Sequence, residues 1–170
     1  KSLIVIDMQK GSFTFKTPRY NSTKVISNIN TLTELFRING FPVIFIQHNG
    51  KSENTCLPKS EEWELLDELN IQDTDLIIEK YANDSFYKSK LDSCLKKLKV
   101  EEVFITGCAT DFCVNSTLQS AYSKDYKIVV VYDGHTTADR PALKAKNVIN
   151  HYHWIWENMI PINGKIKIKT

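Results

Sequence analysis

The sequence lacks any long apolar run, and none of its hydrophobic segments approaches the roughly 18–20 residues that cross a membrane as a helix. It opens directly on the strand-like run Leu3 to Ile6, so no secretion signal is expected ahead of the fold. Cysteine is scarce: residues 56, 94, 108 and 113 are too few for a disulfide scaffold and form no paired CxxC zinc motif. These absences favour a cytoplasmic protein with no membrane partner.

The chain also has little net charge. The 22 Lys and Arg residues and 20 Asp and Glu residues leave a formal net charge of +2, which predicts no nucleic-acid partner. Hydrophobic residues make up 42% and charged residues 25% of the chain, as in an average soluble globular protein. A chain of 170 residues can bury its own core, so residues 1–170 are expected to form one domain.

Short apolar runs alternate with helical periodicity along the whole chain. This alternation predicts right-handed βαβ crossovers, and therefore an α/β fold with a parallel sheet of five or six strands covered by helices on both faces. Ligands of such folds bind beyond the carboxyl ends of the strands. The predicted strands are 3–6, 42–46, 75–78, 103–106, 128–132 and 166–168, and the predicted helices are 25–36, 61–69, 86–98, 113–123 and 141–150.

Three chemically useful side chains follow different predicted strands. Asp7 follows the first strand, Lys80 the third, and Cys113 opens the helix after the fourth. Taken alone, an acid after a strand is often a cap or loop anchor, and a strand-end lysine is usually a surface charge. Cys113 differs, because Thr110 or Asp111 is expected to cap its helix, and the positive helix end favours a thiolate. Together the three residues supply a nucleophile, a base and a cation, the set needed for covalent acyl transfer.

These residues lie in segments that resemble the isochorismatase-like cysteine hydrolases, a superfamily that includes nicotinamidases and N-carbamoyl amidohydrolases. The resemblance implies a three-layer αβα Rossmann-like sandwich and a triad of Asp7, Lys80 and Cys113. It also implies a cis peptide bond between Cys108 and Ala109, with the N–H groups of Ala109 and Cys113 forming an oxyanion hole. A homodimer or homotetramer that acts on a small-molecule substrate is the corresponding expectation. The matching segments are Leu3–Gln9, Pro42–His48, Ser60–Leu65, Lys80–Phe86 and Gly107–Val114.

One stretch of the sequence lacks the metal ligands that some family members carry. Another feature, the cysteine nucleophile, indicates which kind of bond is cleaved. Nicotinamidases carry a metal site after the second strand, with an Asp-x-His pair and a further histidine. The stretch here, Gln47 to Lys51, contains only His48 and no acid, so we expect no metal and no other cofactor. Family members that hydrolyse the enol ether of isochorismate need no cysteine nucleophile. The presence of Cys113 therefore favours cleavage of a C–N bond in an amide or carbamoyl substrate.

Four further side chains are candidates for binding the substrate. Gln47 and His48 follow the second predicted strand, Phe13 lies in the loop after Asp7, and Trp63 lies on the short predicted helix after Ser60. Phe13 could equally cover the edge of the core, and Trp63 has the same ambiguity. Two alternatives to a hydrolase stay open. One is a catalytically inactive small-molecule or protein-binding module on the same fold, and the other is a redox sensor that uses Cys108 and Cys113.

Two features near the C-terminus are expected to be structural. The aromatic stretch Tyr152 to Trp156 favours core packing or a subunit interface over a cofactor site. The alternating Lys and Ile residues of the tail, from Lys165 to Lys169, are typical of an edge strand with one packed face and one face guarded by charge.

Overall fold

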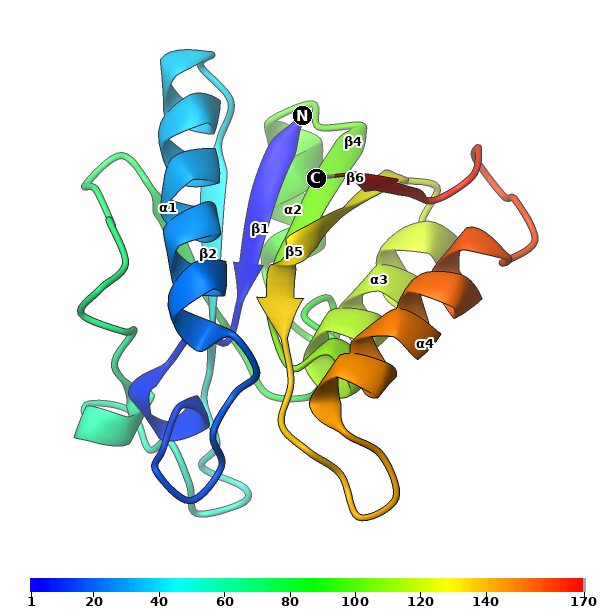
Figure 1. Ribbon diagram of the computed structural model, residues 1–170. Coiled ribbons are helices and arrows are strands. Elements are labelled where there is room, and N and C mark those ends of the chain that lie inside the picture. Colours follow the sequence, from blue (N-terminus) through cyan, green and yellow to red (C-terminus); the bar gives the residue numbers. More distant parts are fainter. Residues whose placement is uncertain (170) are drawn as a thin grey trace.

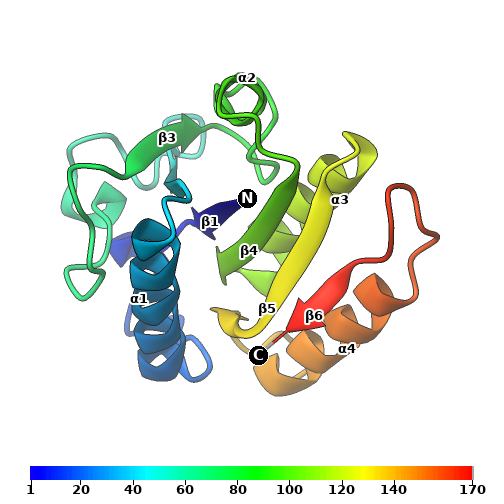
Figure 2. The same cartoon turned by 90° about the horizontal axis from the view of Figure 1, so that it is seen from above.

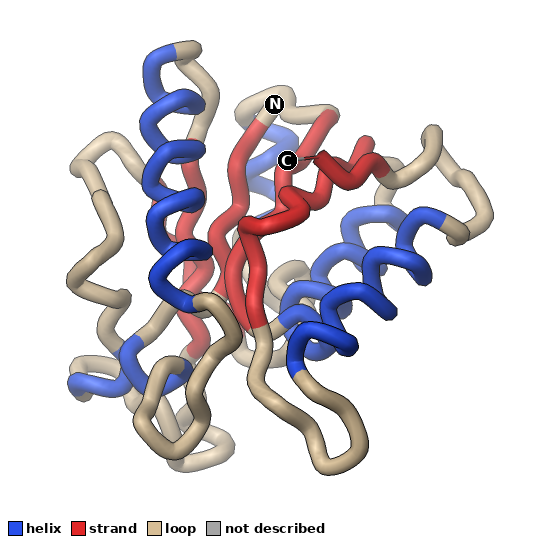
Figure 3. Tube along the Cα trace, viewed as in Figure 1, coloured by secondary structure: helices blue, strands red, loops and turns tan. Residues whose placement is uncertain are grey.

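The computed structural model, which describes residues 1–169, contains one six-stranded sheet with helices on both faces (Figure 1). Every strand pairing is parallel, and the strand order is β3-β2-β1-β4-β5-β6. The tube view in Figure 3 shows the strands as one continuous layer between the helices. The predicted α/β class and parallel sheet are therefore confirmed. The strands are β1 (Ser2–Ile6), β2 (Val43–His48), β3 (Leu76–Lys80), β4 (Glu102–Cys108), β5 (Lys127–Thr136) and β6 (Lys167–Lys169).

The helices are distributed unequally over the two faces of the sheet. One face is covered by α1 (Ser22–Ile38), which lies apart from the other helices in the view of Figure 2. The opposite face is covered by α2 (Leu91–Lys97), α3 (Asn115–Ser123) and α4 (Ala145–Glu157). Within residues 1–169, no helix is long and apolar enough to cross a membrane.

The central strand β1 explains why the first apolar run does not alternate with polar residues. Leu3 and Val5 pack in the cluster beneath α1, whereas Ile4 and Ile6 pack in the cluster beneath α2, α3 and α4. All four side chains are fully buried, because both faces of a parallel sheet are covered. The strand order reverses between β1 and β4, and this switch point brings the carboxyl ends of β1 and β4 together.

Three predicted helices have different limits in the structure. The helix predicted over 61–69 is wrong: only Glu61–Trp63 form a short 3-10 turn, and Leu66 N–H instead donates to the carbonyl of Met8. Tertiary hydrogen bonds replace helical ones in this segment. The helix predicted over 86–98 is reduced to α2, and the one predicted over 141–150 is displaced to α4, at residues 145–157.

The aromatic stretch lies within α4, so its side chains divide between the two sides of that helix. Trp156 is 1% exposed in the core, while Trp154 is 63% exposed. The first turn of α4 is held by Asp139, whose carboxylate accepts from Ala145 N–H at 2.9 Å. In the edge strand β6, Ile168 packs against the core and the lysines on either side are exposed, as the alternating tail predicts.

Candidate active site

Three of the predicted site residues meet at the carboxyl edge of the sheet. Asp7 directly follows β1, Lys80 is the last residue of β3, and Cys113 lies in the turn after β4. The ammonium nitrogen Nζ of Lys80 lies 2.8 Å from Oδ2 of Asp7 and 3.3 Å from Sγ of Cys113. The cation therefore bridges the carboxylate and the thiol.

Asp7 reaches this position because the backbone turns sharply where β1 ends. Its φ angle is 49°, in the left-handed region that Asp and Asn adopt more readily than most other residues. The Asp7 N–H still donates to the carbonyl of Ile46 on β2, at 3.0 Å, so the backbone remains fixed to the sheet. The side chain is nearly buried, and its second oxygen, Oδ1, has no hydrogen-bond partner among the described residues.

Lys80 is fully buried, so it is not the surface charge that a strand-end lysine usually is. Its ammonium donates to the carbonyl of Ala82 at 2.7 Å and to that of Asn83 at 3.5 Å, besides its contacts with Asp7 and Cys113. Burial acts to lower the pKa of Lys80, but the charge of Asp7 and the hydrogen bonds with Asp7 and Cys113 outweigh it and raise that pKa above its ordinary value. Lys80 is therefore a fixed positive charge at neutral pH.

The turn that carries Cys113 differs from the predicted helix start. Residues Thr110–Val114 form a π-helical turn before α3 begins, and no side chain caps it. The predicted capping roles are wrong: the Thr110 hydroxyl pairs with His135, and the Asp111 carboxylate accepts from Arg140 at 2.6 Å. The cysteine is held by the strand end and its contacts, not by a capped first turn.

The backbone just before this turn has two special features. The peptide bond between Cys108 and Ala109 is cis, as the family resemblance implies. Gly107 has a φ angle of +114°, and a Cβ atom at this position would lie 2.2 Å from the carbonyl oxygen of Ile6. Only glycine therefore lets β4 approach β1 this closely where the site forms.

The surroundings of Cys113 favour a resting thiol. Burial raises the pKa of Cys113 far above its ordinary value, the charge of Asp7 raises it further, and Lys80 acts in the opposite direction. The thiol also lies 3.6 Å from Oδ1 of Asn83, a residue that sequence reasoning did not single out although it falls in the matching segment Lys80–Phe86. This environment therefore favours a neutral thiol, not the thiolate that a capped helix start would favour.

Of the four predicted substrate-binding side chains, two make structural contacts and two have a buried nitrogen without a partner within residues 1–169. Gln47 is buried, and its amide donates to the Trp63 carbonyl at 2.9 Å; Gln9 donates to the same carbonyl at 2.8 Å. These amides hold the turn that carries Trp63. Phe13 packs at the edge of the core cluster beneath α1. By contrast, Nε1 of Trp63 and Nδ1 of His48 are buried without a partner among the described residues.

A hydrogen-bonded chain behind the cysteine turn also escaped prediction. Nδ1 of His135 lies 2.9 Å from the Thr110 hydroxyl, and Nε2 of His135 lies 2.8 Å from Nε2 of His153. Burial lowers the pKa of His135 to about 3 and that of His153 to about 4, so both rings are neutral at pH 7. The sequence could not predict these contacts, because Thr110, His135 and His153 lie in three separate elements: the cysteine turn, β5 and α4.

The residues at the end of β2 do not fit a metal site. The Gln47 amide is used in the contact with Trp63, and the one imidazole, His48, faces Glu53 at 3.5 Å. Across residues 1–169, no group of three or more His, Cys, Asp or Glu side chains is arranged to hold a metal ion.

The structure also argues against the redox sensor that uses Cys108 and Cys113. Cys108 is buried, and burial raises its pKa to about 12, which disfavours the reactive thiolate.

Comparisons with known proteins agree on one family. The model of the isochorismatase domain matches residues 1–153. The chain is 31% identical to the isochorismatase family protein YrdC of Bacillus subtilis, over 78% of this chain and 72% of that protein. It is 28% identical to the ureidoacrylate amidohydrolase RutB of Pseudomonas syringae, over 91% of this chain and 79% of that protein. A crystal structure of an isochorismatase family protein superimposes with a TM-score of 0.90 at 27% identity, covering 99% of this chain and 97% of that one.

Proposed function

The chain belongs to the isochorismatase family, and on that premise we propose that it is a hydrolase that cleaves a C–N bond of a small amide or carbamoyl substrate through a thioester on Cys113. One observation carries the proposal: the buried Lys80 ammonium contacts both the Asp7 carboxylate and the Cys113 sulfur. A nucleophile and a proton acceptor held by the same cation suit covalent acyl transfer. The similarity to a ureidoacrylate amidohydrolase supports the same class of bond.

In the acylation half of the reaction, Sγ of Cys113 attacks the substrate carbonyl carbon while Asp7 accepts the thiol proton. A C–S bond forms, and the carbonyl electron pair moves to oxygen, where the N–H groups of Ala109 and Cys113 would receive the negative charge. The tetrahedral species then expels the amine. The C–N bond breaks as Asp7 returns its proton to the nitrogen, which leaves a thioester on Cys113.

In the second half, Asp7 acts as a base again. It takes a proton from water, the hydroxide equivalent attacks the thioester carbonyl, and the C–S bond breaks as the proton returns to sulfur. The overall balance is one amide and one water converted to one acid and one amine. Lys80 pairs with Asp7 between the steps and lowers the cost of negative charge on sulfur during attack.

Three buried polar atoms without a partner in the described part of the chain support a polar, planar substrate. The Asp7 oxygen Oδ1 can accept a hydrogen bond, and the indole Nε1 of Trp63 can donate one, and neither has a partner among residues 1–169. Nδ1 of His48 is unpartnered as well and serves as donor or acceptor according to its tautomer. An amide or ureido group offers both donors and a carbonyl acceptor, so it can satisfy such a set. No step is assigned to a metal, because the residues at the end of β2 do not fit one.

A substrate screen tests the proposal directly. Purified protein is incubated with small amides, ureides and carbamoyl compounds, and ammonia release is measured, with Cys113→Ala as the blank. Release that requires Cys113, together with a mass increase on the Cys113 peptide after acid quenching, supports the thioester route. Turnover of equal rate in Cys113→Ala refutes it, and binding of these compounds without any turnover would favour the inactive binding module.

A further inference from the structure

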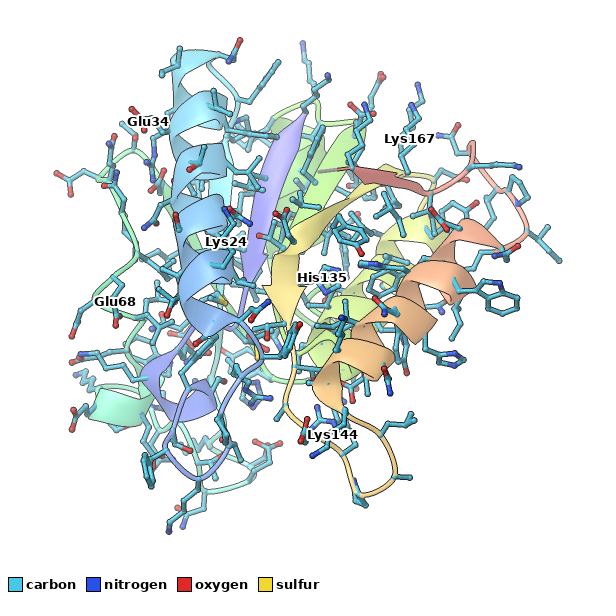
Figure 4. All side chains as sticks on the ribbon, viewed as in Figure 1. Lys24, Glu34, Glu68, His135, Lys144 and Lys167 are labelled. Carbon is cyan, nitrogen blue, oxygen red and sulfur yellow. The ribbon has the colours of Figure 1, made fainter. Side chains whose placement is uncertain are left out.

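A cavity lies apart from the triad, on the side of the molecule where α1 and α4 flank β5. Its volume is about 160 Å³, and its walls come from the first turns of the two helices and from the second half of β5. Figure 4 shows two of the lining residues, Lys24 on α1 and His135 on β5, together with the start of α4. The function proposed above uses none of the side chains that line this cavity.

The cavity has an apolar interior. Val25 and Ile149, which are both buried, line it together with Tyr132 and His135. A protein cavity of about 150 Å³ with apolar walls takes up a molecule the size of benzene. The occupant that fits is therefore one small ring or a short branched chain, not a nucleotide or a peptide.

The rim of the cavity is positively charged. The charged residues that line the cavity are Lys24 on α1, Lys146 on α4 and Asp133 on β5, which together carry a net charge of +1. Neither lysine lies within ion-pair distance of a carboxylate in residues 1–169, although Lys10, Lys80, Lys96 and Lys144 all do.

The two helices add to this positive potential. Both α1, of 17 residues, and α4, of 13 residues, begin at the carboxyl edge of the sheet (Figure 1). Residues of both N-terminal turns line the cavity. Neither helix carries an acid in its first turn to offset the positive end of its dipole.

From this combination we infer that the cavity between α1 and α4 is a second ligand site, which binds a small apolar monoanion such as an aromatic carboxylate. The ring of the ligand enters the apolar interior, and its carboxylate stays at the rim between Lys24 and Lys146. The site is distinct from the catalytic one, because it lies between α1 and α4 and contains none of Asp7, Lys80 or Cys113.

Benzoate is the probe, and benzamide is its neutral control of nearly the same shape. Binding is followed by NMR shifts of the backbone amides of residues 20–25 and 145–150. The protein is first treated with iodoacetamide to block Cys113, so that binding of a product-like acid at the triad does not contribute. Benzoate is expected to shift these amides in a saturable manner, and benzamide is expected to bind roughly tenfold more weakly, since it lacks the charge.

Matched variants identify the residues that bind the probe. Lys24→Gln combined with Lys146→Gln should weaken benzoate binding roughly tenfold, whereas Lys167→Gln on the edge strand should leave it unchanged. Asn150→Trp, which fills the cavity from its rim, should abolish binding. Asn147→Trp, an exposed position on the same helix that does not line the cavity, serves as its control.

The inference is overturned if benzoate causes no saturable shift at residues 20–25 and 145–150. It is also overturned if benzamide binds as tightly as benzoate, or if the double lysine variant binds as tightly as the wild type. None of these measurements uses the hydrolytic activity, so the result is independent of whether a substrate for the triad is found.

Discussion

Replacing Lys80 by methionine tests whether the central ion pair is as buried as the structure makes it. Methionine keeps the length and the apolar stem of the side chain but removes the charge. Asp7 would then be a carboxylate with 4% exposure and no cation, because Lys80 supplies its ion pair at 2.8 Å. Removing one partner of a buried pair typically costs about 3–5 kcal/mol, since the other charge stays desolvated and unpaired.

A double-mutant cycle separates this effect from a loss of packing. Lys80→Met and Asp7→Asn should each destabilise the fold by about 3–5 kcal/mol, but the double variant should cost far less than their sum. The pH of the measurement follows from the sign of the shift. The pKa of Lys80 is raised in the folded state, so its contribution to stability is complete below 10.5 and is lost only as the pH rises above that value. Measurements at pH 7–8 therefore capture it in full.

The assay is urea unfolding, followed by far-ultraviolet circular dichroism and extrapolated to zero denaturant. Lys96→Met is the matched control, because Lys96 forms an ion pair with Asp92 at a similar distance, 2.6 Å, but its side chain is 72% exposed. That pair should contribute no more than about 0.5 kcal/mol. The reasoning is refuted if Lys80→Met costs no more than Lys96→Met, or if the two single changes at the buried pair add up in the double variant.

Three further predictions concern the backbone, the pH dependence and the metal. Gly107→Ala should destabilise the protein by at least about 3 kcal/mol in urea unfolding, because its Cβ would meet the carbonyl of Ile6 at 2.2 Å, whereas Gly40→Ala meets no atom within 4 Å and should cost about 1 kcal/mol; similar costs would disprove the close-approach argument. Burial lowers the pKa of His135 to about 3, so the unfolded chain takes up a proton below about pH 6.5 that the folded protein does not, and stability should fall by about 2 kcal/mol between pH 7.5 and pH 5 through this residue. His135→Gln should reduce that fall and the exposed His151→Gln should not; an identical pH profile in all three proteins would contradict the burial of the ring. Elemental analysis should find no stoichiometric transition metal, and chelation should leave hydrolysis unchanged; loss of a bound metal together with activity would contradict this.

The sheet could be predicted from the sequence because its strands are buried on both faces. Runs such as Leu3 to Ile6 and Pro42 to Ile46 are apolar without interruption, a pattern that few structures other than a parallel strand require in a short segment. The helices were less predictable. Residues 61–69 have a helical composition, but the amides of Gln9 and Gln47 donate to the carbonyl of Trp63, and Leu65 forms a β-bridge with Gln9, beyond the end of β1.

The site was predictable to the extent that its residues follow strands. Asp7, Lys80 and Cys113 could be placed at one edge because the carboxyl ends of parallel strands share that edge. The turn around Cys113 could not, because the partner of Thr110 lies 25 residues away and no local spacing encodes that contact. The capped helix start expected from the sequence would favour a thiolate, whereas burial in the fold raises the pKa of the Cys113 thiol.

The catalytic role of the triad is tested most directly by one paired measurement on a single preparation of Asp7→Asn. Ammonia release from a substrate found in the screen and alkylation of Cys113 by iodoacetamide are both compared with the wild type. Turnover should fall at least about 100-fold, because Asp7 carries the proton to the leaving nitrogen. Alkylation should fall by less than about tenfold, or even rise, because the lost carboxylate is one of the charges that raise the pKa of Cys113. Undiminished turnover in Asp7→Asn, or turnover and alkylation that fall by the same factor, would contradict the triad.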